Sequence, residues 1–144
     1  MRIRRALQES LISAIMLLLC CSLAGQDKEF KPNIQKTDDG VCYLSTGVGY
    51  DSRVNLPHFS LRLVFSARTG KYLADIDLVI TQGPTGKSTK IHSQGPWLEV
   101  NLAPGTYKVS ARNIKGQEVS RRFSVLKNRV SQVNLVWDIS DEEI

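Results

Sequence analysis

The clearest evidence for the fold lies in residues 95–109, which read Gly95-Pro96-Trp97-Leu98-Glu99-Val100-Asn101-Leu102-Ala103-Pro104-Gly105-Thr106-Tyr107-Lys108-Val109. Apolar residues alternate with other residues up to Leu102 and again from Tyr107, and this spacing predicts two β-strands. Between them, Pro104 sets φ for the first corner of a turn, and Gly105 supplies the positive φ that a type II turn requires next. The stretch therefore predicts two strands joined by a Pro-Gly turn.

The same pattern of a short apolar strand followed by a turn continues on both sides of this stretch. The segments that we expect to form strands are 61–66, 76–81, 88–92, 98–102, 106–112, 118–126 and 133–137. A distance of roughly ten residues from turn to turn is typical of two packed antiparallel sheets. We therefore predict an all-β domain, namely a single antiparallel β-sandwich of the immunoglobulin-like or transthyretin-like kind with about seven strands.

Residues 1–24 have the pattern of a signal peptide. Three arginines precede an apolar stretch over residues 11–19 that is short for a bilayer span, and Ser22 and Ala24 occupy the small-residue positions before a cleavage site. We expect cleavage after Ala24 and a periplasmic or secreted protein. One alternative is an uncleaved segment that anchors the protein in the inner membrane, which would be its only membrane contact. The other is a lipoprotein modified at Cys20 or Cys21, although neither follows a small residue.

Composition divides the rest of the chain into three parts. We expect a mobile leader and turn-rich lead-in over residues 25–58, the β-sandwich domain over 59–138 and an acidic tail over 139–144. The full chain has a formal net charge of +5, and loss of three arginines and one glutamate with the signal peptide leaves about +3. This balance is too mild to indicate nucleic acid, and the one aromatic residue within 121–129, Phe123, is in phase with the apolar face of its predicted strand and is not placed to stack on bases.

Residues that could carry chemistry are few. Cys42 would be the one cysteine left after cleavage, so it cannot form an internal disulfide, and we expect it to be half-buried. His58 and His92 lack the spacing of metal ligands. Asp75 and Asp77 share one face of a predicted strand, but two carboxylates do not complete a calcium site. We predict no catalytic residue, metal or cofactor; a small exported hydrolase, or an inhibitor of one, is an alternative that would depend on Cys42, Asp75 or His92.

Aromatic residues are the best candidates for a binding surface. Trp97 is out of phase with the apolar residues that follow it, so we expect it on the outer face of its strand, whereas Trp137 is in phase with the core. The candidate surface consists of Trp97, Tyr72, Tyr50, Asp51 and Arg53. Packing is the alternative role for each of the aromatic residues. We predict a protein-interaction or scaffolding module with an envelope protein as its partner, and the alternative is a module that binds carbohydrate or the cell envelope.

Leu102 and Pro104-Gly105-Thr106-Tyr107 carry a resemblance to a known group of domains. On this pattern, residues 75–137 resemble the carboxypeptidase regulatory-like and transthyretin-like β-sandwich superfamily. A longer span resembles uncharacterised exported proteins of Gram-negative bacteria, and its matching segments are Gly47-Val48-Gly49, Asp51, Arg53, Leu61–Phe65, Tyr72–Asp75 and Gly95-Pro96-Trp97. Ser52 departs from the pattern, because an acidic residue is expected there. The resemblance implies a periplasmic, non-catalytic domain and carries no catalytic residues.

Overall fold

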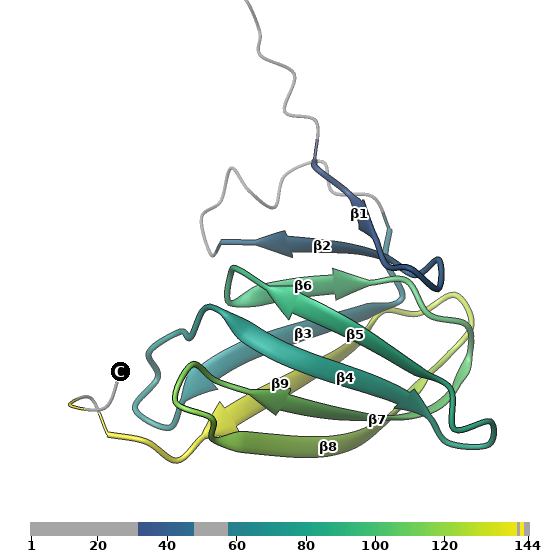
Figure 1. Cartoon of the computed structure of the whole chain (residues 1–144). Helices are drawn as coiled ribbons and strands as arrows, with labels where there is room; N and C mark the ends of the chain where they lie inside the picture. The colour runs from purple at the N-terminus through teal and green to yellow at the C-terminus, as the bar shows by residue number, and fades with distance from the viewer. Residues whose placement is uncertain (1–31, 48–57, 141, 143–144) are drawn as a thin grey trace, which may run out of the picture. The chain divides into compact units, whose positions relative to one another are not determined.

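Nine β-strands form the part of the chain that the computed structural model describes, which is residues 32–47, 58–140 and 142 (Figure 1). The strands are β1 (Gln35–Lys36), β2 (Cys42–Thr46), β3 (Leu61–Ala67), β4 (Ile76–Gln82), β5 (Ser88–Ser93), β6 (Trp97–Val100), β7 (Gly105–Arg112), β8 (Glu118–Val125) and β9 (Ser131–Trp137). The prediction of an all-β domain is confirmed for these residues, which contain no α-helix. In particular, they include no helix of the length and apolar character that crossing a bilayer demands.

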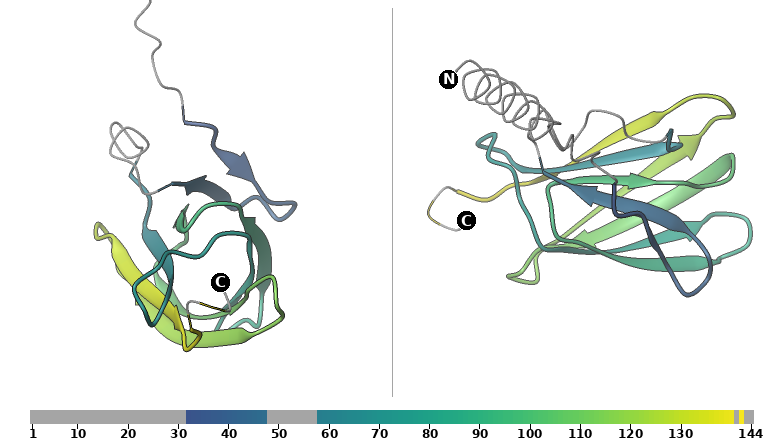
Figure 2. Two further views of the ribbon diagram at one scale, coloured as in Figure 1. Left: turned by 90° about the vertical axis from the view of Figure 1, so that its left-hand side faces the viewer. Right: turned by 90° about the horizontal axis from the view of Figure 1, so that it is seen from above.

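The strands form two sheets that share one hydrophobic core, in a sandwich-like arrangement (Figure 2). One sheet has five strands in the order β1-β2-β6-β3-β9, and the other has four in the order β5-β4-β7-β8. Each strand pair is antiparallel except β3 and β9, which run parallel. The prediction of purely antiparallel sheets was therefore wrong at this pair. The chain crosses from one sheet to the other between β8 and β9, so β9 does not form a hairpin with β8 and instead pairs with β3, to which it runs parallel.

The alternation that we used to predict the strands does mark the core. Residues 61, 63 and 65 of β3 and residues 98 and 100 of β6 have no exposed surface, and Trp137 of β9 is 2% exposed. Trp137 meets Phe65 edge to face, with ring centroids 6.3 Å apart, and its indole N–H donates to the carbonyl of Gln117 at 3.0 Å. The expectation that Trp137 fills the core is confirmed. Ile139 is also buried in this core, so packing extends past the expected domain end at residue 138.

Two strands lie where we expected a mobile leader and lead-in. The short β1 pairs with β2, and β2 pairs with β6 over residues 43–46, which brings the number of strands to nine instead of about seven. The sequence of β2 shows no alternation of apolar and polar residues, because this strand is half-buried or buried on both faces and consists largely of small or polar residues. A half-exposed strand shows clean alternation, but a strand covered on both faces does not.

The Pro104-Gly105 connection is a crossing between sheets and not a tight hairpin, because β6 and β7 belong to different sheets. Gly105 has φ of 158°, close to extended backbone, and it opens β7 opposite Val125. A type II turn would need φ near +80° at this position. The predicted turn type was therefore wrong, although the strands on either side were placed correctly.

Tyr107 fixes the start of β7 after this crossing. Its hydroxyl donates to the carbonyl oxygen of Ala103 at 2.5 Å, and its ring stacks on Phe123 with centroids 5.7 Å apart. Burial raises the pKa of Tyr107 above 10.0. The residue therefore joins the connection to the core through one hydrogen bond and one aromatic contact.

We expect Tyr107→Phe to lower the free energy of unfolding by about 1 kcal/mol at neutral pH, because the Ala103 carbonyl loses its donor. The raised pKa means that the fold favours the neutral phenol. This part of the stability is complete below pH 10 and declines as pH rises toward the higher pKa of the folded state. Urea unfolding of both proteins at pH 7 and above pH 10 measures the difference. Equal stability at pH 7 would contradict the role of the hydroxyl.

Candidate functional site

Several residues that we selected from the sequence lie outside the described residues. These are Ala24 at the expected cleavage site and, in the candidate binding surface, Tyr50, Asp51 and Arg53. Their roles, and the export of the protein, stay predictions.

Trp97 lies on the outer face of the five-stranded sheet, in register with Thr46 of β2 and Val64 of β3. The guanidinium of Arg62 lies over the indole, 5.3 Å from the ring centroid, and the same side chain forms an ion pair with Glu99 at 2.5 Å. Glu99 is only 2% exposed. The indole is thus half-buried, and one ring face already contacts a cation within the chain, which makes it a poor platform for a sugar.

Tyr72 and Cys42 lie in separate places. Tyr72 belongs to the connection from β3 to β4, is 50% exposed, and forms an isolated bridge with Ser66. Cys42 is half-buried, as expected, and opens β2 opposite Lys36. It belongs to a different sheet from His92, so the structure does not pair this thiol with that imidazole.

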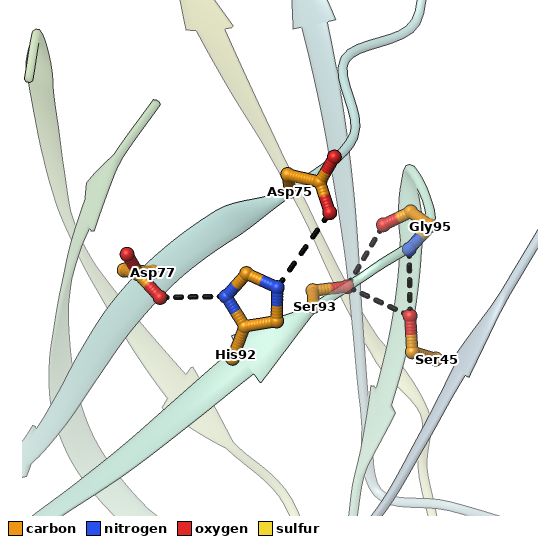
Figure 3. A network of polar contacts seen from close by, with 6 residues as sticks. All are labelled: Ser45, Asp75, Asp77, His92, Ser93 and Gly95. Carbon is orange, nitrogen blue, oxygen red and sulfur yellow. Dashed lines mark hydrogen bonds and ion pairs between the residues drawn. The ribbon is translucent and has the colours of Figure 1, made fainter. Parts of the chain in front are cut away.

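His92 is the centre of a polar cluster on the outer face of the four-stranded sheet (Figure 3). It lies opposite Asp77 in the register of β4 and β5, and its Nδ1 is 2.6 Å from an Asp77 carboxylate oxygen. Its Nε2 is 3.6 Å from a carboxylate oxygen of Asp75. Asp75 has φ of 54°, an uncommon conformation for a residue with a side chain. The ring therefore lies between two carboxylates, each of which faces a different nitrogen.

Ser93, the next residue in the chain, does not form a nucleophilic pair with His92. The Ser93 side chain points to the opposite face, where it is fully buried and donates to the carbonyl of Gly95 at 2.8 Å. Its hydroxyl oxygen also lies 3.1 Å from that of Ser45. Across the described ranges, no group of three or more histidine, cysteine, aspartate or glutamate side chains could hold a metal ion. The visible role of the cluster is to link β4 to β5.

Side chains close the open sides between the two sheets. Arg121 of β8 donates to the carbonyl of Asn134 in β9 at 2.9 Å, and Ser131 of β9 donates to the carbonyl of Ser124 at the same distance. On the other side, Thr89 of β5 donates to Asp39, which follows β1, at 2.5 Å. Hydrogen bonds from Thr37 and Thr89 hold the pKa of Asp39 below its usual value. These contacts join β8 to β9 and β5 to the turn after β1.

A groove at one end of the sheets is a candidate binding site that the sequence did not predict. It has a volume of about 520 Å³ and lies between residues 58–60, the β6–β7 connection and the β8–β9 connection, residues 126–130. Ser60 forms its fixed floor, since the Ser60 hydroxyl donates to the carbonyl of Leu102 at 3.0 Å and accepts from the amide of Leu102 at 2.7 Å. The Ser60 carbonyl also accepts from the amide of Ser131 at 2.9 Å. One serine thus joins residues 58–60 to the β6–β7 connection and to the start of β9.

The rim of this end groove is both apolar and basic. Leu126 is 53% exposed and Val130 is 52% exposed, on either side of a turn in which Asn128 has φ of 60°. Lys127 and Arg129 lie in the same turn and are exposed. Two large aliphatic side chains are thus exposed together beside a groove of ligand size, which makes this end of the sheets a candidate binding surface.

Comparisons of the chain with protein-family models, with curated proteins and with solved structures found no match.

Proposed function

We propose that this chain is an exported, non-catalytic interaction module that binds a segment of a partner protein in the end groove. The observation that carries the proposal is the pair of exposed aliphatic side chains, Leu126 and Val130, on a rim whose floor is fixed by Ser60. A floor that is already ordered loses little conformational entropy on binding. The basic turn residues Lys127 and Arg129 favour a partner segment in which an apolar side chain has a carboxylate beside it.

The finer assignment of the fold is part of the same proposal. We assign the domain to the transthyretin-like and carboxypeptidase regulatory-like β-sandwiches. The crossing from β6 to β7 supports this, because Tyr107 near the start of β7 bonds back to a carbonyl four residues upstream, as tyrosine corners do in related sandwiches. The signal-peptide pattern of residues 1–24 supports export.

Photo-crosslinking in cells of the native host tests the proposal. A photoreactive phenylalanine analogue at position 126 is expected to give one dominant protein adduct, which mass spectrometry can identify. The matched control is position 114, where an isoleucine is 78% exposed in the turn between β7 and β8, at the opposite end of β8. Adducts at 126 but not at 114 support the proposal.

Two results would overturn it. Equal adducts at both positions would mean that exposed aliphatic side chains of this protein crosslink without specificity. Adducts at 126 that contain only glycan or lipid would assign the groove to a ligand other than protein.

A further inference from the structure

The outer face of the four-stranded sheet divides into a charge-paired end and a basic part. At the paired end, the two acidic residues that belong to the strands contact a basic partner in the neighbouring strand: Asp77 with His92, and Glu118 with Arg112 at 3.1 Å. The register places Arg112 beside Asp77 as well, so basic and acidic residues alternate across β5, β4, β7 and β8. Such a row stabilises the sheet through cross-strand pairs.

The basic part of the face contains cations that have no acidic partner. Lys108 of β7 lies directly opposite Arg122 of β8, and both are exposed. Lys90 of β5 is a third exposed cation on the same face, one row nearer the paired end. Within the described ranges, none of the three forms an ion pair. Like charges directly opposite each other destabilise a sheet, so the stability of the fold does not explain this arrangement.

Hydroxyl groups surround these cations where acidic residues could have neutralised them. The outward neighbours are Thr81, Ser88, Thr106, Ser110, Ser120 and Ser124. Ser110 and Ser120 lie 2.9 Å apart, oxygen to oxygen, and Thr81 and Ser88 lie 3.1 Å apart. Each hydroxyl can still donate or accept another hydrogen bond.

A pocket of about 450 Å³ lies at the charge-paired end of the face and reaches Lys90. Its lining includes Asp77 and Glu118 together with His92 and Arg112, and it does not include Lys108 or Arg122. The basic part of the face is therefore an open surface of hydroxyls and cations outside this pocket.

We propose that this basic face binds an acidic polysaccharide, through Lys108, Arg122 and Lys90. Its carboxylate or sulfate groups would pair with the cations, and its hydroxyls would hydrogen-bond with the serine and threonine side chains. The site is separate from the end groove, so the module would bind a glycan on one surface and a protein segment on another.

Two other anionic partners fit the face less well. Insertion into a lipid surface uses exposed aromatic or aliphatic side chains, but the one apolar side chain among the outward positions of these four strands is the half-buried Val79. Binding of single-stranded nucleic acid uses aromatic side chains that stack on bases, and the outward positions of these strands include none.

Titration of the full-length protein with polygalacturonate, with neutral dextran as the ligand control, tests this proposal. We expect polygalacturonate to bind and the double variant Lys108→Gln/Arg122→Gln to bind it about tenfold more weakly. The matched control is Lys36→Gln/Lys115→Gln, which removes the same charge from exposed lysines of β1 and of the β7–β8 turn. It should change the affinity less than about twofold. Arg122→Gln alone should raise the unfolding temperature, because it removes the like-charge contact.

Four results would overturn the proposal: no binding of polygalacturonate by the native sequence, equal loss of affinity in the two double variants, equal binding of dextran, or binding to anionic vesicles without binding to polygalacturonate. The second would mean that net charge alone controls the affinity. The last would assign the face to lipid.

Discussion

Replacing Arg62 with leucine is expected to lower the free energy of unfolding by about 3 kcal/mol. The substitution would leave the carboxylate of Glu99, which is 2% exposed, without the cation that now lies 2.5 Å from it. It would also remove the guanidinium from the face of Trp97, a contact that adds roughly 0.5–2 kcal/mol where it is shielded from water. Urea unfolding at neutral pH, followed by tryptophan fluorescence and by circular dichroism, measures the change.

Two further variants separate the buried charge from the loss of a side chain. The double variant Arg62→Leu/Glu99→Leu removes both charges and should recover most of the stability, because an apolar pair of similar size costs little in a buried position. Arg112→Leu breaks an exposed pair with Glu118 and should cost less than about 1 kcal/mol. If Arg62→Leu and Arg112→Leu lower the free energy of unfolding by the same amount, then water reaches Glu99 and the Arg62–Glu99 pair contributes no more to stability than an exposed pair.

The ion pair between Arg62 and Glu99 could not be predicted from the sequence. Glu99 and Arg62 occupy outward positions of alternating strands, and such positions normally hold solvated charges. Their pairing depends on the register between β3 and β6, which are 37 residues apart at this contact. Alternation identified which side chains of β3, β4, β7 and β9 enter the core, but it carries no information about the register between distant strands.

The candidate sites divide in the same way. We predicted Asp75 and Asp77 on one face of a strand, but Asp75 precedes β4 and has φ of 54°. Only the register of β4 with β5 brings His92 to Asp77. The end groove combines three connections that are far apart in the chain, so no single stretch could indicate it. The opposition of Lys108 and Arg122 likewise requires the β7–β8 register. The alternation of apolar residues thus predicted the strands, whereas the surfaces depend on how distant strands pair.

Gly95 is the position where the approach of two chain segments leaves least room. It lies in the connection between β5 and β6, and its amide donates to the Ser45 hydroxyl at 2.8 Å. A Cβ at this position would overlap the carbonyl oxygen of Thr46 and lie 2.7 Å from the carbonyl carbon. Both atoms belong to backbone, so no side-chain rotation can relieve the contact. The adjoining Pro96 carbonyl accepts from the amide of Phe65 at 2.9 Å, which restricts movement in the other direction.

We therefore expect Gly95→Ala to cost about 3 kcal/mol in the free energy of unfolding, through the displacement of β2 from β6. Hydrogen exchange should show lost protection at residues 43–46 before any loss at β4 or β7. Gly47→Ala is the matched control, because a Cβ there would meet no atom of the described residues within 4 Å and the residue has no positive φ. It should leave stability unchanged or raise it by up to about 1 kcal/mol. Equal, small effects of the two substitutions would show that β2 can move away from the β5–β6 connection at little cost, and that this strand is only loosely attached to the sheet.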